Sequence, residues 1–123
     1  MVSIMGHYYP NKMALKNFGY NIKKDRQIDY DSNSRQMFDA VSQKAASICT
    51  CMACGSCTST CSAGQFVDFS FRRLILHVQR GETQQVEKEI AKCMMCGKCI
   101  LVCPRGVNTR QVILEIKRFI STR

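Results

Sequence analysis

The sequence predicts an all-α domain that follows an irregular N-terminal arm. Apolar side chains recur at the three-to-four-residue spacing of helices, and no segment alternates as a strand would. Two cysteine motifs, at residues 51–61 and 93–103, interrupt this helical pattern. We therefore expect an arm over residues 1–33 and a single helical domain over residues 34–123.

The helices before and after the first motif are predicted from their apolar stripes. Ser34 is expected to cap a helix that runs to about Ser47. Its apolar positions are Met37, Phe38, Val41, Ala45 and Ile48. A second helical pattern contains Phe66, Phe69, Leu74, Ile75 and Val78. Gly81 is expected to end this second helix, because glycine readily adopts the left-handed conformation of a helix C-terminus.

Two more helices complete the domain. Val86 and Ile90 stand four residues apart and predict a helix that leads into the second motif. Asn108 or Thr109 is expected to cap the C-terminal helix. The apolar stripe of that helix comprises Val112, Ile113, Ile116, Phe119 and Ile120.

Composition narrows the class of protein. The chain has 123 residues, nine of them cysteine, and a formal charge of +9. This mixture excludes collagen, low-complexity disorder and coiled coil, and no apolar run reaches the ~18 residues of a membrane span. We expect a cytoplasmic protein, because the N-terminus lacks the apolar core of a signal peptide. In that setting the cysteines are predicted to be metal ligands rather than disulfides.

The two cysteine motifs form an internal repeat with an offset of 42 residues. Residues 51–61 read CMACGSCTSTC and residues 93–103 read CMMCGKCILVC, so both have the spacing C-x2-C-x2-C-x3-C. This is the spacing of a cubane 4Fe–4S site, in which three cysteines along a tight turn bind three corners of one cluster. Gly55 and Gly97 allow the backbone to approach the cluster.

The fourth cysteine of each motif is predicted to ligate the other cluster, as it does in two-cluster ferredoxins. One cluster then takes Cys51, Cys54, Cys57 and Cys103. The other takes Cys93, Cys96, Cys99 and Cys61. Structural zinc is the alternative, but zinc sites usually pair two C-x2-C knuckles that lie a dozen or more residues apart. Cys49 falls outside the repeated register and is expected to be a free or buried thiol.

Two clusters would also account for part of the basic charge. Eight thiolates and two cores of ~+2 each add about −4 to the formal charge of +9. We therefore expect no nucleic-acid partner, and the aromatic residues do not alternate with basic ones as a binding stripe would require.

Several single residues are assigned provisional roles. His77 is expected at the surface or its boundary, and His7 in the arm has no partner spacing. The methionines of the motifs are expected to pack around the clusters; they are Met52, Met94 and Met95. Three apolar residues are expected to keep water from the second cluster; they are Ile100, Leu101 and Val102. Arg105 is either a solvated charge or a cation beside a cluster.

The arm over residues 1–33 permits two interpretations. It holds all four tyrosines, which are Tyr8, Tyr9, Tyr20 and Tyr30. The segment is either a flexible tail or a docking arm, since tyrosine is common on partner surfaces.

Residues 51–123 resemble the C-type subunit of heterodisulfide reductase and its bacterial relatives. The resemblance rests on the first motif, on the helix from Phe71 to Gly81 and above all on CPRGV at residues 103–107. Ser62 stands where the family usually has proline, which removes no ligand.

The resemblance implies an α-helical ferredoxin module with two 4Fe–4S clusters bound by the eight cysteines above. It also implies a non-catalytic, electron-carrying role within an oxidoreductase complex. The partners it implies are an A-type protein with flavin and iron–sulfur centres and a B-type protein with CCG domains. A free ferredoxin is the alternative, as is the iron–sulfur subunit of a complex like succinate dehydrogenase, glycolate oxidase or glycerol-3-phosphate dehydrogenase.

Overall fold

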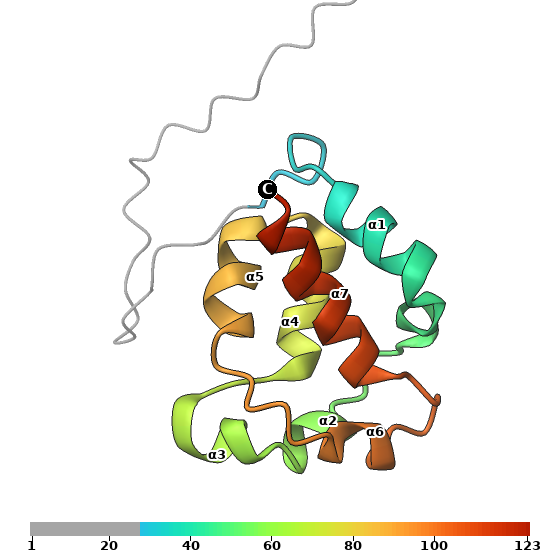
Figure 1. Ribbon diagram of the computed structural model, residues 1–123, viewed down its shortest axis with the longest axis vertical. Coiled ribbons are helices and arrows are strands. Elements are labelled where there is room, and N and C mark those ends of the chain that lie inside the picture. The colour runs from blue at the N-terminus through green and yellow to red at the C-terminus, as the bar shows by residue number, and fades with distance from the viewer. Residues whose placement is uncertain (1–27) are drawn as a thin grey trace, which may run out of the picture.

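All regular secondary structure in residues 28–123, the part of the chain that the computed structural model describes, is helical (Figure 1). The elements are α1 (Gln36–Lys44), the 3-10 helix η1 (Ala46–Thr50), α2 (Ser56–Ser59), α3 (Ser62–Val67), α4 (Phe71–Arg80), α5 (Thr83–Ile90), α6 (Lys98–Val102) and α7 (Thr109–Ser121). The prediction of an all-α fold is thus confirmed.

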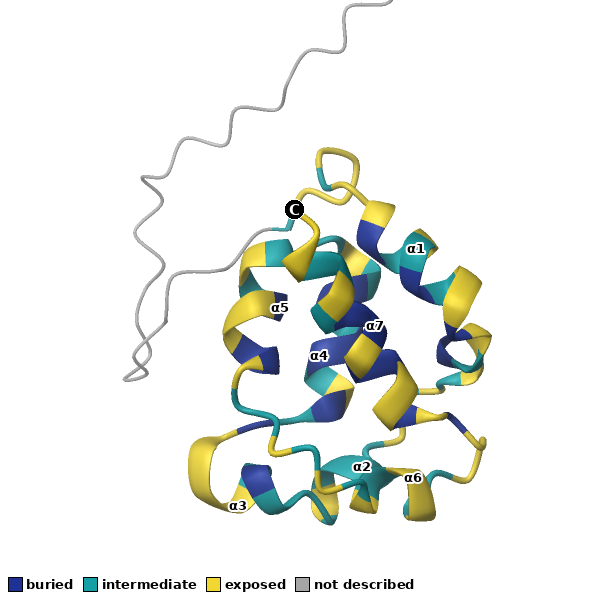
Figure 2. Ribbon diagram, viewed as in Figure 1, coloured by how far each residue is buried: buried dark blue, intermediate teal, exposed yellow. Residues whose placement is uncertain are grey.

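Four helices enclose the apolar core. α7 packs against α1 and α5, and α4 packs against α1 and α5. Figure 2 shows that all four of these helices carry buried residues. The most deeply buried side chains include Met37, Val41, Leu74, Ile75, Val78, Val86, Val112 and Ile116. These residues belong to the stripes predicted from the sequence, because several turns of helix define one apolar face.

The three short helices, α2, α3 and α6, lie together at the opposite end of the molecule from the chain's C-terminus (Figure 1). α2 packs against α6 and α4, and α6 also contacts α7. The first cysteine motif surrounds α2, and the second motif surrounds α6. The core helices therefore form a scaffold on which the two motifs are held side by side.

Helix ends follow the expected capping chemistry at two places. Gly81 ends α4 in the left-handed conformation, with a φ of 74°. The Asn108 side chain accepts a hydrogen bond of 3.2 Å from the Gln111 amide at the start of α7. Both predictions are confirmed, and the Asn108 cap fixes the point where the chain leaves the second motif.

Two helix boundaries differ from the prediction. The first helix begins at Gln36 and ends at Lys44, because Ala45 leaves the helical region with φ −130° and ψ 65°. The expected helix from Phe66 to Gly81 is two helices, since Asp68 adopts a left-handed φ of 49° between α3 and α4. As a consequence Phe66 is not a core residue but is 79% exposed.

The predicted arm lies mostly outside the described residues, which begin at Ile28. The last part of that segment is fixed to the domain: the Asn33 side-chain amide donates a hydrogen bond of 3.0 Å to the Arg80 carbonyl. Among the helices of residues 28–123, none has the length and apolar character needed to cross a membrane.

Candidate functional site

The internal repeat is visible in the backbone of the two motifs. Ala53 and Met95, at equivalent positions, have φ values of 55° and 56°, and Gly55 and Gly97 have φ values of 84° and 78°. Left-handed residues next to right-handed ones turn successive N–H groups inward and form a concave anion site, as in many iron–sulfur proteins. Each motif therefore provides a preformed turn that suits a negatively charged group.

The first hollow is bordered by three cysteines of the first motif and one of the second. These are Cys51, Cys54, Cys57 and Cys103. The hollow encloses about 380 Å³, including space open to solvent. Cys103 reaches it because α6 ends at Val102 and the chain then runs extended through Cys103, with ψ 114°.

The second hollow has the reciprocal composition. It is bordered by Cys61, Cys93, Cys96 and Cys99. It encloses about 430 Å³, again including space open to solvent. Cys61 is extended, with ψ 120°, and thus carries the chain from α2 to the wall of this hollow before α3 begins.

The structure therefore brings together the same two sets of four cysteines that the crossed assignment groups. Ligation itself stays a prediction, but the grouping has a structural cause: α2 and α6 pack together, which places each fourth cysteine beside the opposite motif. The two hollows are neighbours, because Phe71 at the start of α4 borders both of them and is only 2% exposed.

Polar groups approach several of the sulfur atoms. The Thr109 hydroxyl lies 2.8 Å from Cys99 Sγ, and the Val107 amide donates to Cys103 Sγ at 3.4 Å. Cys54 Sγ lies 3.5 Å from the Ser56 hydroxyl. Hydrogen bonds to cluster sulfurs favour the more negative, reduced state, so these donors would affect reduction potentials.

The thiols differ in how easily they lose a proton. The hydrogen bond with the Ser56 side chain lowers the pKa of Cys54, and the Lys98 amide lowers the pKa of Cys96. Burial raises the pKa of Cys57 and of Cys93. The two lowered thiols occupy equivalent positions in the repeat, just before the glycine that starts each short helix. Metal binding, which requires thiolates, is thus favoured at these two positions.

Arginines stand at both hollows. Arg72 and Arg105 border the first hollow, and Arg110 borders the second. Arg105 also donates a hydrogen bond of 3.4 Å from Nε to the Thr50 carbonyl. Arg105 is exposed to solvent and also borders the first hollow, so the structure is consistent with both of the roles expected for it.

The donor set fits an iron–sulfur cluster. A tetrahedral zinc ion lies ~2.3 Å from each sulfur, so its four ligands must converge on one point. Within residues 28–123, no three His, Cys, Asp or Glu side chains are placed to hold a single metal ion. The cysteines instead line the walls of hollows, which suits a group that spans the space between them.

The comparison with protein families agrees with this geometry. Residues 50–107 match the family model of the 4Fe-4S dicluster domain. A 4Fe–4S dicluster domain is present in this chain. The matched segment includes both cysteine motifs and the helices between them, and it indicates an iron–sulfur electron carrier. No curated protein matches the chain.

Several predicted roles around the dicluster domain are wrong. His77 is buried, with 7% of its surface exposed, and its Nδ1 lies 2.6 Å from Glu82 Oε2. Leu101 does not shield the second hollow but is 86% exposed, and Ile100 is 36% exposed. α6 has only five residues, and its outward side carries these apolar groups because its inward side is occupied by Cys99.

The structure also places the three motif methionines and the ninth cysteine. Met95 borders the second hollow and also packs against the apolar core. Met52 and Met94 border the hollows but are 57% and 54% exposed, so they cover the sites only in part. Cys49 is an exposed free thiol and borders neither hollow.

Sequence reasoning missed Thr109 and Phe71 as residues of the site. The sequence marks Thr109 only as a possible helix cap, yet it is 1% exposed and contacts Cys99. It marks Phe71 only as part of a helix, although this residue borders both hollows. No local signal identifies either residue, because both positions depend on how separate helices pack.

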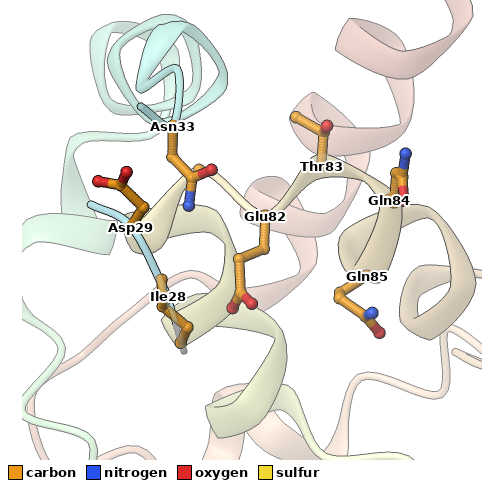
Figure 3. Close-up of a pocket in the computed structure, with 8 residues that line it drawn as sticks. Ile28, Asp29, Asn33, Glu82, Thr83, Gln84 and Gln85 are labelled. Carbon is orange, nitrogen blue, oxygen red and sulfur yellow. The ribbon is translucent and has the colours of Figure 1, made fainter. Parts of the chain in front are cut away.

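A polar hollow at the α4–α5 corner is separate from the dicluster site (Figure 3). It is bordered by Ile28, Asp29, Asn33, Gly81, Glu82, Thr83, Gln84 and Gln85. None of these residues is a cysteine or belongs to a motif. The hollow forms where residues 28–33 cross the turn between α4 and α5, and we assign it no role in electron transfer.

Proposed function

We propose that this chain holds two 4Fe–4S clusters and relays electrons between them and its partners. The observation that carries the proposal is the pair of adjacent hollows, each bordered by three cysteines of one motif and one of the other. Eight thiolates in two sets of four are what two cubane clusters require. The eight ligands we propose are Cys51, Cys54, Cys57, Cys61, Cys93, Cys96, Cys99 and Cys103.

A relay is the role that suits neighbouring clusters. Phe71 borders both hollows, so an electron that enters one cluster has the second as its nearest acceptor. The cationic groups Arg72, Arg105 and Arg110 stabilise the additional negative charge of reduced clusters. We propose no bond-making chemistry for this chain and regard it as an electron-carrying, non-catalytic component of a larger enzyme.

The complex that we propose is similar to heterodisulfide reductase. In it the chain would connect an A-type flavin and iron–sulfur protein with a B-type CCG-domain protein. The support is the resemblance of residues 51–123, above all CPRGV at residues 103–107. The last residue of that motif also contacts the site, since the Val107 amide donates to Cys103 Sγ. A free-standing ferredoxin is the second candidate.

Anaerobic purification of the full chain tests the cluster content. We expect about eight iron and eight sulfide per chain, since each cubane carries four of each. Fully reduced protein should show two magnetically interacting cubane signals by electron paramagnetic resonance. Zinc in place of iron and sulfide would contradict the proposal.

Native co-purification tests the complex. The tagged chain should elute with a CCG-domain protein and a flavoprotein, identified by mass spectrometry. A monomeric iron–sulfur protein with no partner would instead favour the free ferredoxin.

A further inference from the structure

Most of the exposed apolar surface lies around the two cysteine-bordered hollows. Of the eight large hydrophobic side chains exposed in residues 28–123, six belong to the cysteine motifs or to α3. We call these six residues the apolar rim: Met52, Phe66, Val67, Met94, Ile100 and Leu101. Leu101, at 86%, and Phe66, at 79%, are the most exposed of all.

Two residues of the apolar rim border the hollows directly, and the other four belong to short helices that contribute a residue to the second hollow. Met52 borders the first hollow and Met94 the second. α3, which ends with Phe66 and Val67, contributes Ala63 to the second hollow. α6, which carries Leu101, contributes Cys99 to the same hollow. Exposed apolar side chains that gather near a site favour an interaction surface there.

The charges around the rim are almost all positive. Residues 50–67 and 93–110 contain Lys98, Arg105 and Arg110 but no Asp or Glu, and Arg72 adds a fourth cation at the first hollow. All four of these cations are exposed. Asp68, next to the rim, is engaged by Arg73, whose Nη1 lies 3.5 Å from Asp68 Oδ1.

We propose that the apolar rim docks a redox protein whose own surface has an apolar centre and acidic groups around it. This inference rests on the proposed electron-relay function. Two oxidised clusters would add about −4 within the hollows. At long range this charge offsets the four cations, so the charge complementarity acts mainly when the exposed cations contact the partner.

Other occupants of the rim fit less well. A second copy of the chain would bring the same four cations against each other. The chain's own residues 1–27 carry five basic side chains and one acidic one, so they are repelled in the same way. A membrane surface is disfavoured because α3 and α6 have six and five residues, whereas interfacial helices present several turns of apolar face.

Electron transfer from the reduced full-length protein to two well-characterised acceptors tests the proposal. The probes are an acidic plastocyanin and a basic cytochrome c. In anaerobic stopped-flow experiments at low salt, we expect the acidic acceptor to react at least tenfold faster. The advantage should decrease as salt is added.

Variants of the rim make the test specific. Leu101→Ser and Phe66→Ser should each slow the reaction with plastocyanin at least fivefold, and Lys98→Glu should slow it similarly. Leu114→Ser, at a 40% exposed position on α7, and Lys88→Glu, at an exposed position on α5, are the matched controls and should react like wild type. Equal effects of rim and control variants would overturn the proposal.

Two further measurements separate the possible failures. All variants should retain wild-type iron content, and Leu101→Ser and Phe66→Ser should reduce an uncharged benzoquinone at the wild-type rate. If the anaerobically purified wild-type protein contains no iron, the proposed function is refuted. If the clusters are intact but the protein shows no preference between the two acceptors, only the docking surface is refuted. The protein should not sediment with vesicles of phosphatidylcholine and phosphatidylglycerol. If it does, and if Leu101→Ser abolishes this binding, the rim binds a membrane and the proposal of a protein partner is wrong.

Discussion

The crossed grouping of cysteines leads to a prediction about iron content. Replacing Cys93, Cys96 and Cys99 by alanine removes three of the four cysteines that border the second hollow but none that border the first. Since each hollow accounts for one cluster of four irons, iron content should fall from about eight to about four per chain.

A fourth substitution in this variant then identifies the remaining ligand set. If the surviving cluster is bound in the first hollow, adding Cys103→Ala should remove the last four irons. Adding Cys61→Ala should leave them in place, because Cys61 borders the other hollow. Cys49→Ser is the matched control, since this exposed thiol borders neither hollow and its loss should leave eight irons in the wild-type background.

Iron and acid-labile sulfide analysis of anaerobically purified protein provides the assay. The magnetic interaction between clusters should also disappear in the triple variant, because only one cluster is left. The reciprocal variant, without Cys51, Cys54 and Cys57, should show the opposite dependence, on Cys61 rather than Cys103. If the four irons of the first variant depend on Cys61 and not on Cys103, each motif binds its own cluster and our reasoning is refuted.

Three other changes test the surroundings of the clusters and the core. Arg105→Gln should lower the potential of the first cluster by roughly tens of millivolts in a redox titration, because an exposed cation that borders this hollow would stabilise the more negative, reduced cluster. Thr109→Val keeps the shape but removes the hydroxyl 2.8 Å from Cys99 Sγ, so the potential of the second cluster should fall. The potential of the first cluster should change less, because Thr109 borders that hollow without a hydrogen bond to any of its cysteines. Ile116→Ala, at a fully buried position of α7, should destabilise the fold by about 2–5 kcal/mol and lower the apparent melting temperature measured by circular dichroism. An unchanged potential or melting temperature would contradict the assignment of that residue.

The burial of His77 beside Glu82 depends on tertiary structure and could not be predicted from the residues adjacent to His77 in the sequence. His77 follows Leu76 and precedes Val78, a position that gives no sign of its partner. The imidazole becomes buried because α4 turns at Gly81 and returns the Glu82 carboxylate to within 2.6 Å of Nδ1. Burial of a polar group is stable when such a partner is present.

The sequence by itself determined the features that depend on spacing. The offset of 42 residues predicted two equivalent cysteine turns, and the stripe of α7 predicted its buried face, with Val112 and Ile116 in the core. Both signals are strong for the same physical reason: cluster ligation and helix packing each impose a regular period on the chain.

Only the tertiary structure decided which groups meet across the chain. α6 has five residues, too few for a helical period to show which face is buried, so its packing against α2 and α7 leaves Leu101 in solvent. The contact between Thr109 and Cys99, and the position of Phe71 between the hollows, likewise arise from segments that approach only in the folded state. Local sequence records the period of an element, whereas the surroundings of a side chain depend on how the elements pack.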